Sequence, residues 1–320
     1  MAEEVSGGER ASAVLIAGPT ASGKSALAVA LAEATGGVVV NADSMQVYDG
    51  LRILTARPSD EDLSRAKHRL YGHVAPDAAY STGAYLRDAA KVLGEIRAAG
   101  RLPIVCGGTG LYVRALLGGI DDMPPVDEGI RARWRARMAE EGPARLHEDL
   151  ARRDPAAAAR IRPADAQRIL RALELLEATG GPLADLQRRA GTPLVEEARA
   201  LKIVLTPPRT ILRERIAQRF DQMMAAGALE EARSFLARPG AAESLAGKAI
   251  GIPELAAHFS GELTLCAAVD RAVTRSRQYA KRQDTWFRHQ LGPDWQRFAD
   301  PADIGLPDVL RTVAVNARSG

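Results

Sequence analysis

The chain has 320 residues, of which 46% are hydrophobic and 26% are charged, and its formal net charge is only +3. This composition is ordinary for a globular protein and excludes a disordered or fibrous chain, while the small charge permits nucleic acid as a partner without arguing for it. No apolar run approaches the roughly 20 residues that span a bilayer. Residues 1–10 are polar, and the two cysteines form no spaced pair. We therefore expect a cytoplasmic protein with neither a membrane segment nor a zinc site.

The first strong signal is an apolar run at 13–17, followed by a glycine-bounded loop at 18–25 and a helical pattern over 24–35. The loop reads Gly18, Pro19, Thr20, Ala21, Ser22, Gly23, Lys24 and Ser25. In this arrangement backbone N–H groups and the helix N-terminus cradle phosphates, the lysine reaches phosphate oxygens and the serine hydroxyl suits Mg²⁺. The loop therefore predicts that the chain binds a di- or triphosphate.

Strand and helix patterns then alternate. A β-branched strand covers 38–41, a helix 84–99 and an apolar strand 102–106. Alternation of this kind predicts a parallel sheet flanked by helices, of the type found in phosphate-loop NTPases. Ligands gather at the carboxyl ends of such strands, where the 18–25 loop and Asp43 fall. We expect the strand before Asp43 to adjoin the phosphate strand.

Asp43 has two readings. At a strand end beside a phosphate cradle, its carboxylate could act as a general base or hold Mg²⁺ in its outer shell. It could equally cap a turn, because aspartate commonly does so where a strand meets a loop.

The strand at 102–106 ends in Gly107-Gly108-Thr109-Gly110, without an acidic residue. Phosphate-loop hydrolases place a magnesium-binding aspartate at a strand end, so this sequence disfavours a standard NTP hydrolase. The glycines allow another group to approach the backbone closely, and Thr109 offers a hydroxyl to the same edge.

Beyond residue 118 strand signals vanish until 201–205. We predict an all-helical insertion at 119–199, a discontinuous catalytic core at 11–118 and 200–300, and tails at 1–10 and 301–320. The helices expected in the insertion cover 127–141, 143–153, 164–179 and 182–190, and those expected later cover 208–225, 228–237 and 264–288.

Several basic stretches have alternative explanations. Arg215 and Arg219 are spaced i, i+4 and could clamp a diphosphate together or pair with acids on the surface. In the insertion, arginines surround Trp134, which fits either RNA contact with base stacking or a salt-bridged surface helix. The basic stretch at 275–288 carries aromatic residues and could line a nucleic-acid channel or pack on the core.

Five motifs in order resemble one family: GPTASGKS (18–25), DSMQVY (43–48), GGTGLY (107–112), QRILRALE (167–174) and RQYAKRQDTWFR (277–288). Over residues 12–290 the chain is similar to bacterial tRNA dimethylallyltransferases, also called tRNA isopentenyltransferases. One departure is Ile252-Pro253, near which the family usually has a tyrosine expected close to the tRNA.

The resemblance implies transfer of a dimethylallyl group from dimethylallyl diphosphate to the exocyclic N6 amine of the adenine 3′-adjacent to the anticodon in tRNA, with release of diphosphate. The partners implied are the anticodon stem-loop of tRNA, the prenyl donor and Mg²⁺, and we expect a monomer. Two alternatives remain: a phosphate-loop small-molecule or nucleotide kinase, and a non-enzymatic RNA-binding module that senses nucleotide.

The resemblance also implies roles for single residues. Lys24 and Arg219 would offset the diphosphate charge, Ser25 would help to place Mg²⁺, Asp43 would take the proton from the amine and Thr109 would position the base. The residues that it implies in tRNA contact are Asp43, Ser44, Met45, Gln46, Thr109, Arg131, Gln167, Arg168, Ile169, Leu170 and Arg171.

Overall fold

The computed structural model describes residues 11–118, 124, 126–186 and 191–313. By its internal contacts the chain divides into two compact units, Gly118–Pro193 and the remainder, which comprises Met1–Leu117 and Leu194–Gly320. The predicted tail 1–10 and the end of the predicted helix 182–190 lie outside the described residues. No helix among the residues described is long and apolar enough to cross a membrane.

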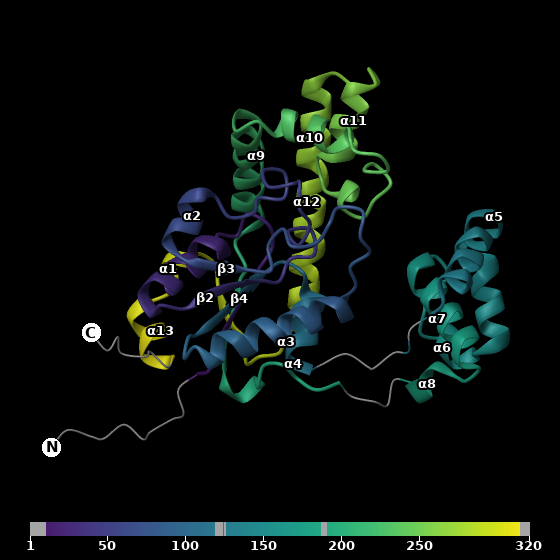
Figure 1. Ribbon diagram of the computed structural model, residues 1–320, viewed down its shortest axis with the longest axis horizontal. Coiled ribbons are helices and arrows are strands. Elements are labelled where there is room, and N and C mark those ends of the chain that lie inside the picture. Colours follow the sequence, from purple (N-terminus) through teal and green to yellow (C-terminus); the bar gives the residue numbers. More distant parts are fainter. Residues whose placement is uncertain (1–10, 119–123, 125, 187–190, 314–320) are drawn as a thin grey trace. The chain divides into compact units, whose positions relative to one another are not determined.

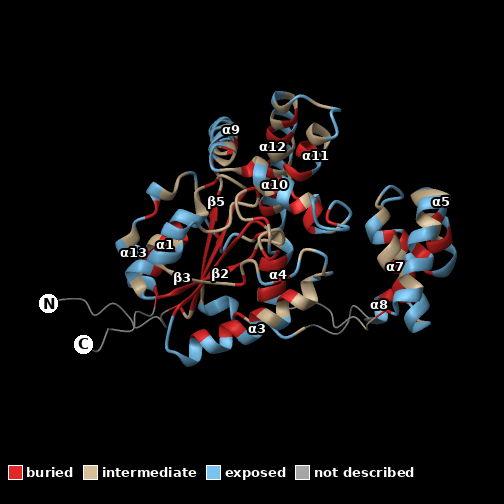
Figure 2. Ribbon diagram, turned by 45° about the horizontal axis from the view of Figure 1, so that its top comes forward, coloured by how far each residue is buried: buried red, intermediate tan, exposed pale blue. Residues whose placement is uncertain are grey.

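The larger unit is built on a parallel six-stranded sheet in the order β3-β2-β4-β1-β5-β6. Figure 1 labels three of its strands, β2, β3 and β4. Its strands are β1 (Ala13–Ala17), β2 (Val38–Asn41), β3 (Lys67–Arg69), β4 (Pro103–Gly107), β5 (Ala200–Leu205) and β6 (Gln296–Phe298). Every residue of β1, β2 and β4 is buried, as the red strands in Figure 2 show. This accounts for their unbroken apolar sequences, because a strand covered on both faces needs no polar alternation.

The strand order corrects one expectation. β4 pairs with β1 on one side and with β2 on the other, so the strand before Asp43 does not adjoin the phosphate strand. The chain runs outward from β1 to β2 and β3 before β4 returns between β1 and β2. The turn after β4 therefore lies between the phosphate loop and Asp43.

Helices cover both faces of the sheet, which confirms the predicted fold class. On one face, Val14 and Ile16 pack with α1 (Lys24–Thr35) and α13 (Leu306–Thr312). On the other face, the alternate residues Ala13 and Leu15 belong to a core shared with several helices. These helices are α3 (Thr82–Ala98), α4 (Gly110–Gly118), α9 (Arg209–Ala225), α10 (Ala228–Leu236), α11 (Ile252–Phe259) and α12 (Leu265–Gln290).

The expectation of a tail at 301–320 is wrong for its first part. Val309 of α13 is buried against the sheet, and Val313 forms a β-bridge with Ala11. Residues 301–313 are therefore part of the core unit. The short α2 (Asp60–Arg65) completes this unit.

The smaller unit is all-helical, with α5 (Glu128–Arg153), α6 (Pro155–Ala158), α7 (Ala166–Thr179) and α8 (Leu183–Leu186). α5 is broken at Gly142, whose φ of 78° is left-handed, immediately before Pro143. The predicted pair of helices on either side of residue 142 is confirmed. The unit has its own core, which includes Trp134, Leu150 and Ile169.

Candidate active site

The loop at 18–25 connects β1 to α1, as predicted. The amide of Ser22 donates to the carbonyl of Pro19 at 3.3 Å, and Gly23 has a left-handed φ of 91° that turns the chain into α1. The first turn of α1 carries no acidic side chain, so its positive dipole end faces the loop unopposed. The Ser22 hydroxyl is buried and has no hydrogen-bond partner among the described residues. Such a group favours a ligand that can accept its proton.

Two cations lie at this loop. Lys24 Nζ donates to the carbonyl oxygen of Pro19 at 3.1 Å, and Arg219 Nη1 donates to Thr20 Oγ1 at 3.4 Å. Burial lowers the pKa of Lys24 and that of Arg219, and the nearby Asp43 carboxylate acts in the opposite direction. Within the described part of the chain neither cation forms an ion pair. Both side chains are half-buried, so their charges are partly removed from water without a counter-charge, and the loop is suited to an anionic ligand.

The two arginines of α9 have separate partners. Arg215 forms an ion pair with Asp300 at 2.7 Å, whereas Arg219 contacts Thr20 of the loop. Of the two alternatives, pairing with an acid holds for Arg215, and the two arginines do not form a joint clamp. Arg219 alone faces the phosphate cradle.

Asp43 is held by its own turn. The buried side chain of Asn41 accepts from the amide of Asp43 at 2.8 Å and donates to its carbonyl oxygen at 2.9 Å. Asp43 Oδ1 accepts from the amide of Met45 at 2.9 Å. No described group donates to the other oxygen, Oδ2. The two readings of Asp43 are thus compatible, because one oxygen caps the turn and the other is free to accept a proton.

Thr109 holds the neighbouring residue of the same turn. Its Oγ1 accepts from the amide of Ser44 at 2.9 Å, and it donates to Ser44 Oγ at 3.2 Å. The next glycine in the motif, Gly110, lies against the Trp286 ring, and a Cβ there would come within 2.2 Å of that ring. This close approach explains why position 110 is a glycine. Through its hydrogen bonds to Ser44, Thr109 links the turn after β4 to the loop that carries Asp43.

The phosphate loop, Asp43 and Arg219 border a cavity of about 110 Å³, which Thr109 does not line. Thr20, Lys24, Ser25, Asp43 and Arg219 form its polar wall. The remaining wall is largely apolar and includes Leu54, Ile216, Phe220, Met223 and Ile250. A cavity that joins a cationic end to an apolar end suits a ligand with a charged head and a short hydrocarbon tail.

Part of this apolar wall was missed by sequence reasoning. The carboxylate of Glu231 on α10 accepts from three successive amides, those of Arg52, Ile53 and Leu54, at 2.6, 2.7 and 2.8 Å. These bonds fix the loop that carries Leu54 into the cavity. No local pattern signals them, because Glu231 is almost 180 residues away in the sequence.

The atypical Ile252 is buried at the start of α11, and only its neighbours Ala249 and Ile250 line the cavity. Glu254, also buried, accepts from the amide of Gly251 at 2.9 Å and forms an ion pair with Arg275. The segment is thus anchored without a tyrosine.

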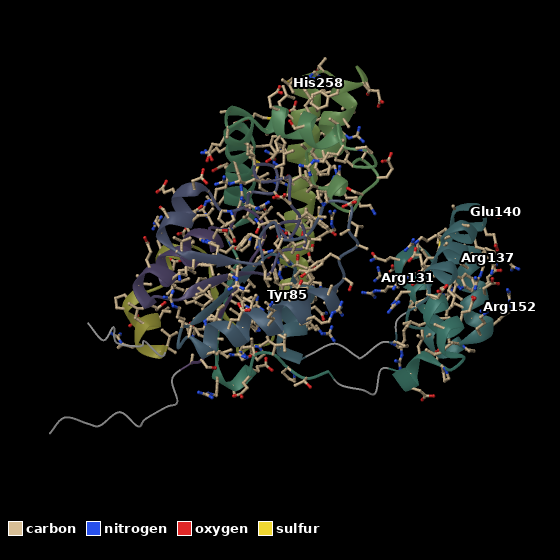
Figure 3. The ribbon with its side chains drawn as sticks, in the orientation of Figure 1. Tyr85, Arg131, Arg137, Glu140, Arg152 and His258 are labelled. Carbon is tan, nitrogen blue, oxygen red and sulfur yellow. The ribbon has the colours of Figure 1, made fainter. Side chains whose placement is uncertain are left out.

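The predicted tRNA residues of the helical unit form local ion pairs. Arg131 pairs with Glu128 at 3.6 Å, Arg168 with Asp165 at 3.5 Å and Arg171 with Glu174 at 3.6 Å. All three arginine side chains remain at least one-third exposed. Figure 3 labels Arg131, Arg137 and Arg152 on α5. Gln167 is exposed and Leu170 is half-buried.

One expectation in this unit needs correction, and one pair of alternatives is decided. Ile169 is completely buried in the core of the unit, so its side chain cannot contact RNA. Trp134 is also buried, donates to Glu177 at 2.8 Å and lies beneath Arg137 and Arg153. It therefore packs the unit and does not stack on bases.

The fold and the cavity together define a phosphate-loop α/β protein whose loop faces a carboxylate and an apolar wall. Two family models match the chain: IPP transferase over residues 46–290 and isopentenyl transferase over 11–75. The chain therefore belongs to the IPP transferase family, which confirms the resemblance seen in its motifs.

Curated relatives support this assignment. The chain is 51% identical over 285 residues to the tRNA dimethylallyltransferase of Agrobacterium fabrum, covering 89% of this chain and 96% of the relative. It is 54% identical over 284 residues to that of a Chelativorans species, covering 89% and 97%.

Solved structures agree. A tRNA isopentenylpyrophosphate transferase of Bacillus halodurans is 35% identical, with a TM-score of 0.65 and 94% of each chain covered. A eukaryotic dimethylallyltransferase acting on tRNA is 25% identical, with a TM-score of 0.76 and coverage of 96% of this chain and 81% of that one.

Proposed function

We propose that this chain transfers a dimethylallyl group from dimethylallyl diphosphate to the N6 amine of the adenine 3′-adjacent to the anticodon in tRNA, releasing diphosphate. Family membership supports prenyl transfer to tRNA. The observation that carries the choice of donor is the pair of half-buried cations, Lys24 and Arg219, which have no ion-pair partner among the described residues and share a cavity with an apolar wall.

The chemistry follows from these groups. An adenine amine is a weak nucleophile because its lone pair is delocalised into the ring, so a base that takes its proton as the bond forms is useful. The amine nitrogen attacks the prenyl carbon, the bond from that carbon to the diphosphate oxygen breaks, and the proton passes to Asp43 Oδ2. Lys24, Arg219 and the loop amides stabilise the charge that develops on the leaving diphosphate.

The adenine must leave the anticodon-loop stack to reach the cavity, since its amine cannot meet the prenyl carbon within a stacked loop. Residues 43–46 and Thr109, at the carboxyl edge of β2 and β4, are proposed to receive it. The apolar wall would hold the prenyl tail and exclude water, which would otherwise compete with the amine for the prenyl carbon.

Labelled dimethylallyl diphosphate incubated with tRNA tests the proposal. We expect label in the RNA, and no label in a tRNA that carries guanine in place of the target adenine. Label that stays in the donor would refute prenyl transfer, and phosphate moving from a nucleotide to a small hydroxyl compound would identify a kinase instead.

Mg²⁺ fits the donor set of this cavity. No group of three or more His, Cys, Asp or Glu residues that could hold a metal occurs in the described part of the chain. Mg²⁺ needs none, because it commonly binds through one or two protein oxygens, substrate phosphates and water. Ser25 would supply one oxygen and Asp43 another through water, and the ion would neutralise diphosphate charge. Chelating Mg²⁺ should weaken the binding of inorganic diphosphate in calorimetry; equal affinity without the ion would contradict this assignment.

One chain is proposed to suffice, since every described residue that lines the cavity comes from the same core unit. We therefore expect a monomer in solution, which sedimentation would test. The tRNA substrate also favours the cytoplasm as the compartment.

We predict that Arg131, Arg168 and Arg171 bind tRNA phosphates. Changing all three to Gln should flatten the plot of log affinity against log salt by about 2 to 3 slope units, because each lost phosphate contact removes about 0.7 to 0.9. Filter binding across a salt series measures the slope, and dimethylallyl diphosphate binding should not change.

The matched control is Arg145→Gln, Arg152→Gln and Arg160→Gln, which removes the same charge from the same unit. An equal slope change in both triple variants would mean that only net charge matters. An unchanged slope in the first variant would make the helical unit structural.

A further inference from the structure

A buried glutamine of α12 joins two loops of the site. Gln283 is 6% exposed, and both ends of its side-chain amide are hydrogen-bonded. Its Oε1 accepts from the amide of Thr20 at 2.9 Å, and its Nε2 donates to the carbonyl oxygen of Gly108 at 2.9 Å. Thr20 belongs to the phosphate loop and Gly108 to the turn after β4. One side chain thus ties two backbone segments that the sequence keeps far apart.

The turn leaves room for this amide. A Cβ on Gly108 would lie 2.3 Å from Gln283 Nε2 and 3.4 Å from its Cδ, so only glycine lets the glutamine approach. The Thr20 amide is in turn committed to Gln283, although the Thr20 side chain faces the cavity and contacts Arg219. Buried amides with both ends satisfied hold their partners in one geometry.

The contacts continue to the proposed base. Thr109 follows Gly108 and binds Ser44, which follows Asp43. A series of hydrogen bonds and peptide links therefore runs from the phosphate loop through Gln283 and the β4 turn to the Asp43 loop. It joins the part of the site that faces the diphosphate to the part that faces the adenine.

We infer that Gln283 is a positioning residue that sets the distance between the phosphate loop and the Asp43 loop, and thereby aligns donor and acceptor for transfer. This inference rests on the proposed function. In-line attack requires the reacting atoms to be about 3 to 3.5 Å apart, and a displacement near 1 Å can cost about 100-fold in rate. A side chain that links the two halves of the site therefore affects the rate of the attack on the prenyl carbon.

The test is Gln283→Met, which keeps the length and volume of the side chain and removes both hydrogen bonds. We expect kcat at saturating substrates to fall by about 100-fold, inorganic diphosphate to bind more weakly, and the tRNA dissociation constant to stay within a factor of two. Gln218→Met, at an exposed position of α9, is the matched control and should behave as the unmodified protein.

Substitutions at Gly108 test the same contact from the other side. Gly108→Ala should displace the Gln283 amide and lower kcat at least as much, because its Cβ would also lie 3.3 Å from Asp43 Oδ2. Adding Gly108→Ala to Gln283→Ala should cost less than Gly108→Ala alone, because the obstructing amide is gone. If the effects of the two substitutions on the barrier to transfer are strictly additive, the proposed link is refuted, because additive effects indicate independent sites.

Two other results would refute the positioning role of Gln283. A lower melting temperature with unchanged kcat, or a change confined to the KM for tRNA, would reduce Gln283 to a packing or RNA-contact residue and refute the inference. If the unmodified protein fails to transfer the prenyl group, the proposed function is wrong, while the diphosphate calorimetry still reports whether Gln283 organises the loop.

Discussion

Asp43→Asn is expected to lower the single-turnover rate of prenyl transfer by about 100- to 10,000-fold, the usual value of general-base assistance. Asparagine retains an oxygen that can accept from the Met45 amide, as Asp43 Oδ1 does at 2.9 Å. It loses the oxygen that would take the proton. Because asparagine caps turns nearly as well as aspartate, the melting temperature should hardly change. The affinity for tRNA should also persist, as should that for diphosphate when it is measured without Mg²⁺.

A control for this change is Asp49→Asn, which removes a carboxylate from an exposed position shortly after the same strand. Its transfer rate should be normal. If Asp43→Asn transfers at a near-normal rate, Asp43 is not the base. A large drop in melting temperature with a modest kinetic loss would make it a turn cap only.

Lys24→Ala is expected to raise the barrier to transfer by about 3 to 4 kcal/mol, by analogy with the loss of one donor to a developing oxyanion. The structural reason is that Lys24 lies at the start of α1 against the carbonyl of Pro19 and has no ion-pair partner among the described residues. Removing this half-buried charge should not destabilise the free protein, since no ion pair is lost with it. Steady-state kinetics beside a melting curve measure both effects, and normal kinetics would refute a phosphate-binding role for the loop.

Arg219→Ala should also impair transfer, but less than Lys24→Ala. Its matched control is Arg215→Ala, one turn earlier on α9, which removes a cation that is paired with Asp300 and does not line the cavity. Equal losses in the two arginine variants would point to a general effect on α9. A loss confined to Arg219→Ala would support its place beside the diphosphate.

Sequence reasoning succeeded where a signal was local. β1, the loop at 18–25 and α1 are contiguous, and their boundaries emerged because an apolar run, two glycines and a helical period follow one another. The edge strand β3, by contrast, is the three-residue Lys67–Arg69, charged and only half-buried, so it lacks the apolar signature of a strand. Since edge strands are covered less and are often charged, such elements are hard to recognise.

The arginine-rich helix shows a different limit. Basic residues around an aromatic one occur both in RNA-binding surfaces and in helices whose tryptophan is packed and covered by guanidinium groups. Trp134 proved to be the latter, with Arg137 at 4.9 Å and Arg153 at 5.1 Å from its ring centroid. Distinguishing the two needs the burial of the ring, which depends on how α5 and α7 pack.

The contact between the two ends of the core unit bears on how the protein is made. Ala11 donates its amide to the carbonyl of Thr312 at 2.9 Å, and Pro301 packs against Gly23 of the phosphate loop. At about 5 to 20 residues per second, a ribosome needs roughly 15 to 60 s to synthesise the intervening stretch. During that time the phosphate loop lacks its contact with Pro301. The helical unit has its own core and can fold in the same interval. Catalytic competence should therefore appear only after residues 301–313 have been synthesised and have packed against the loop.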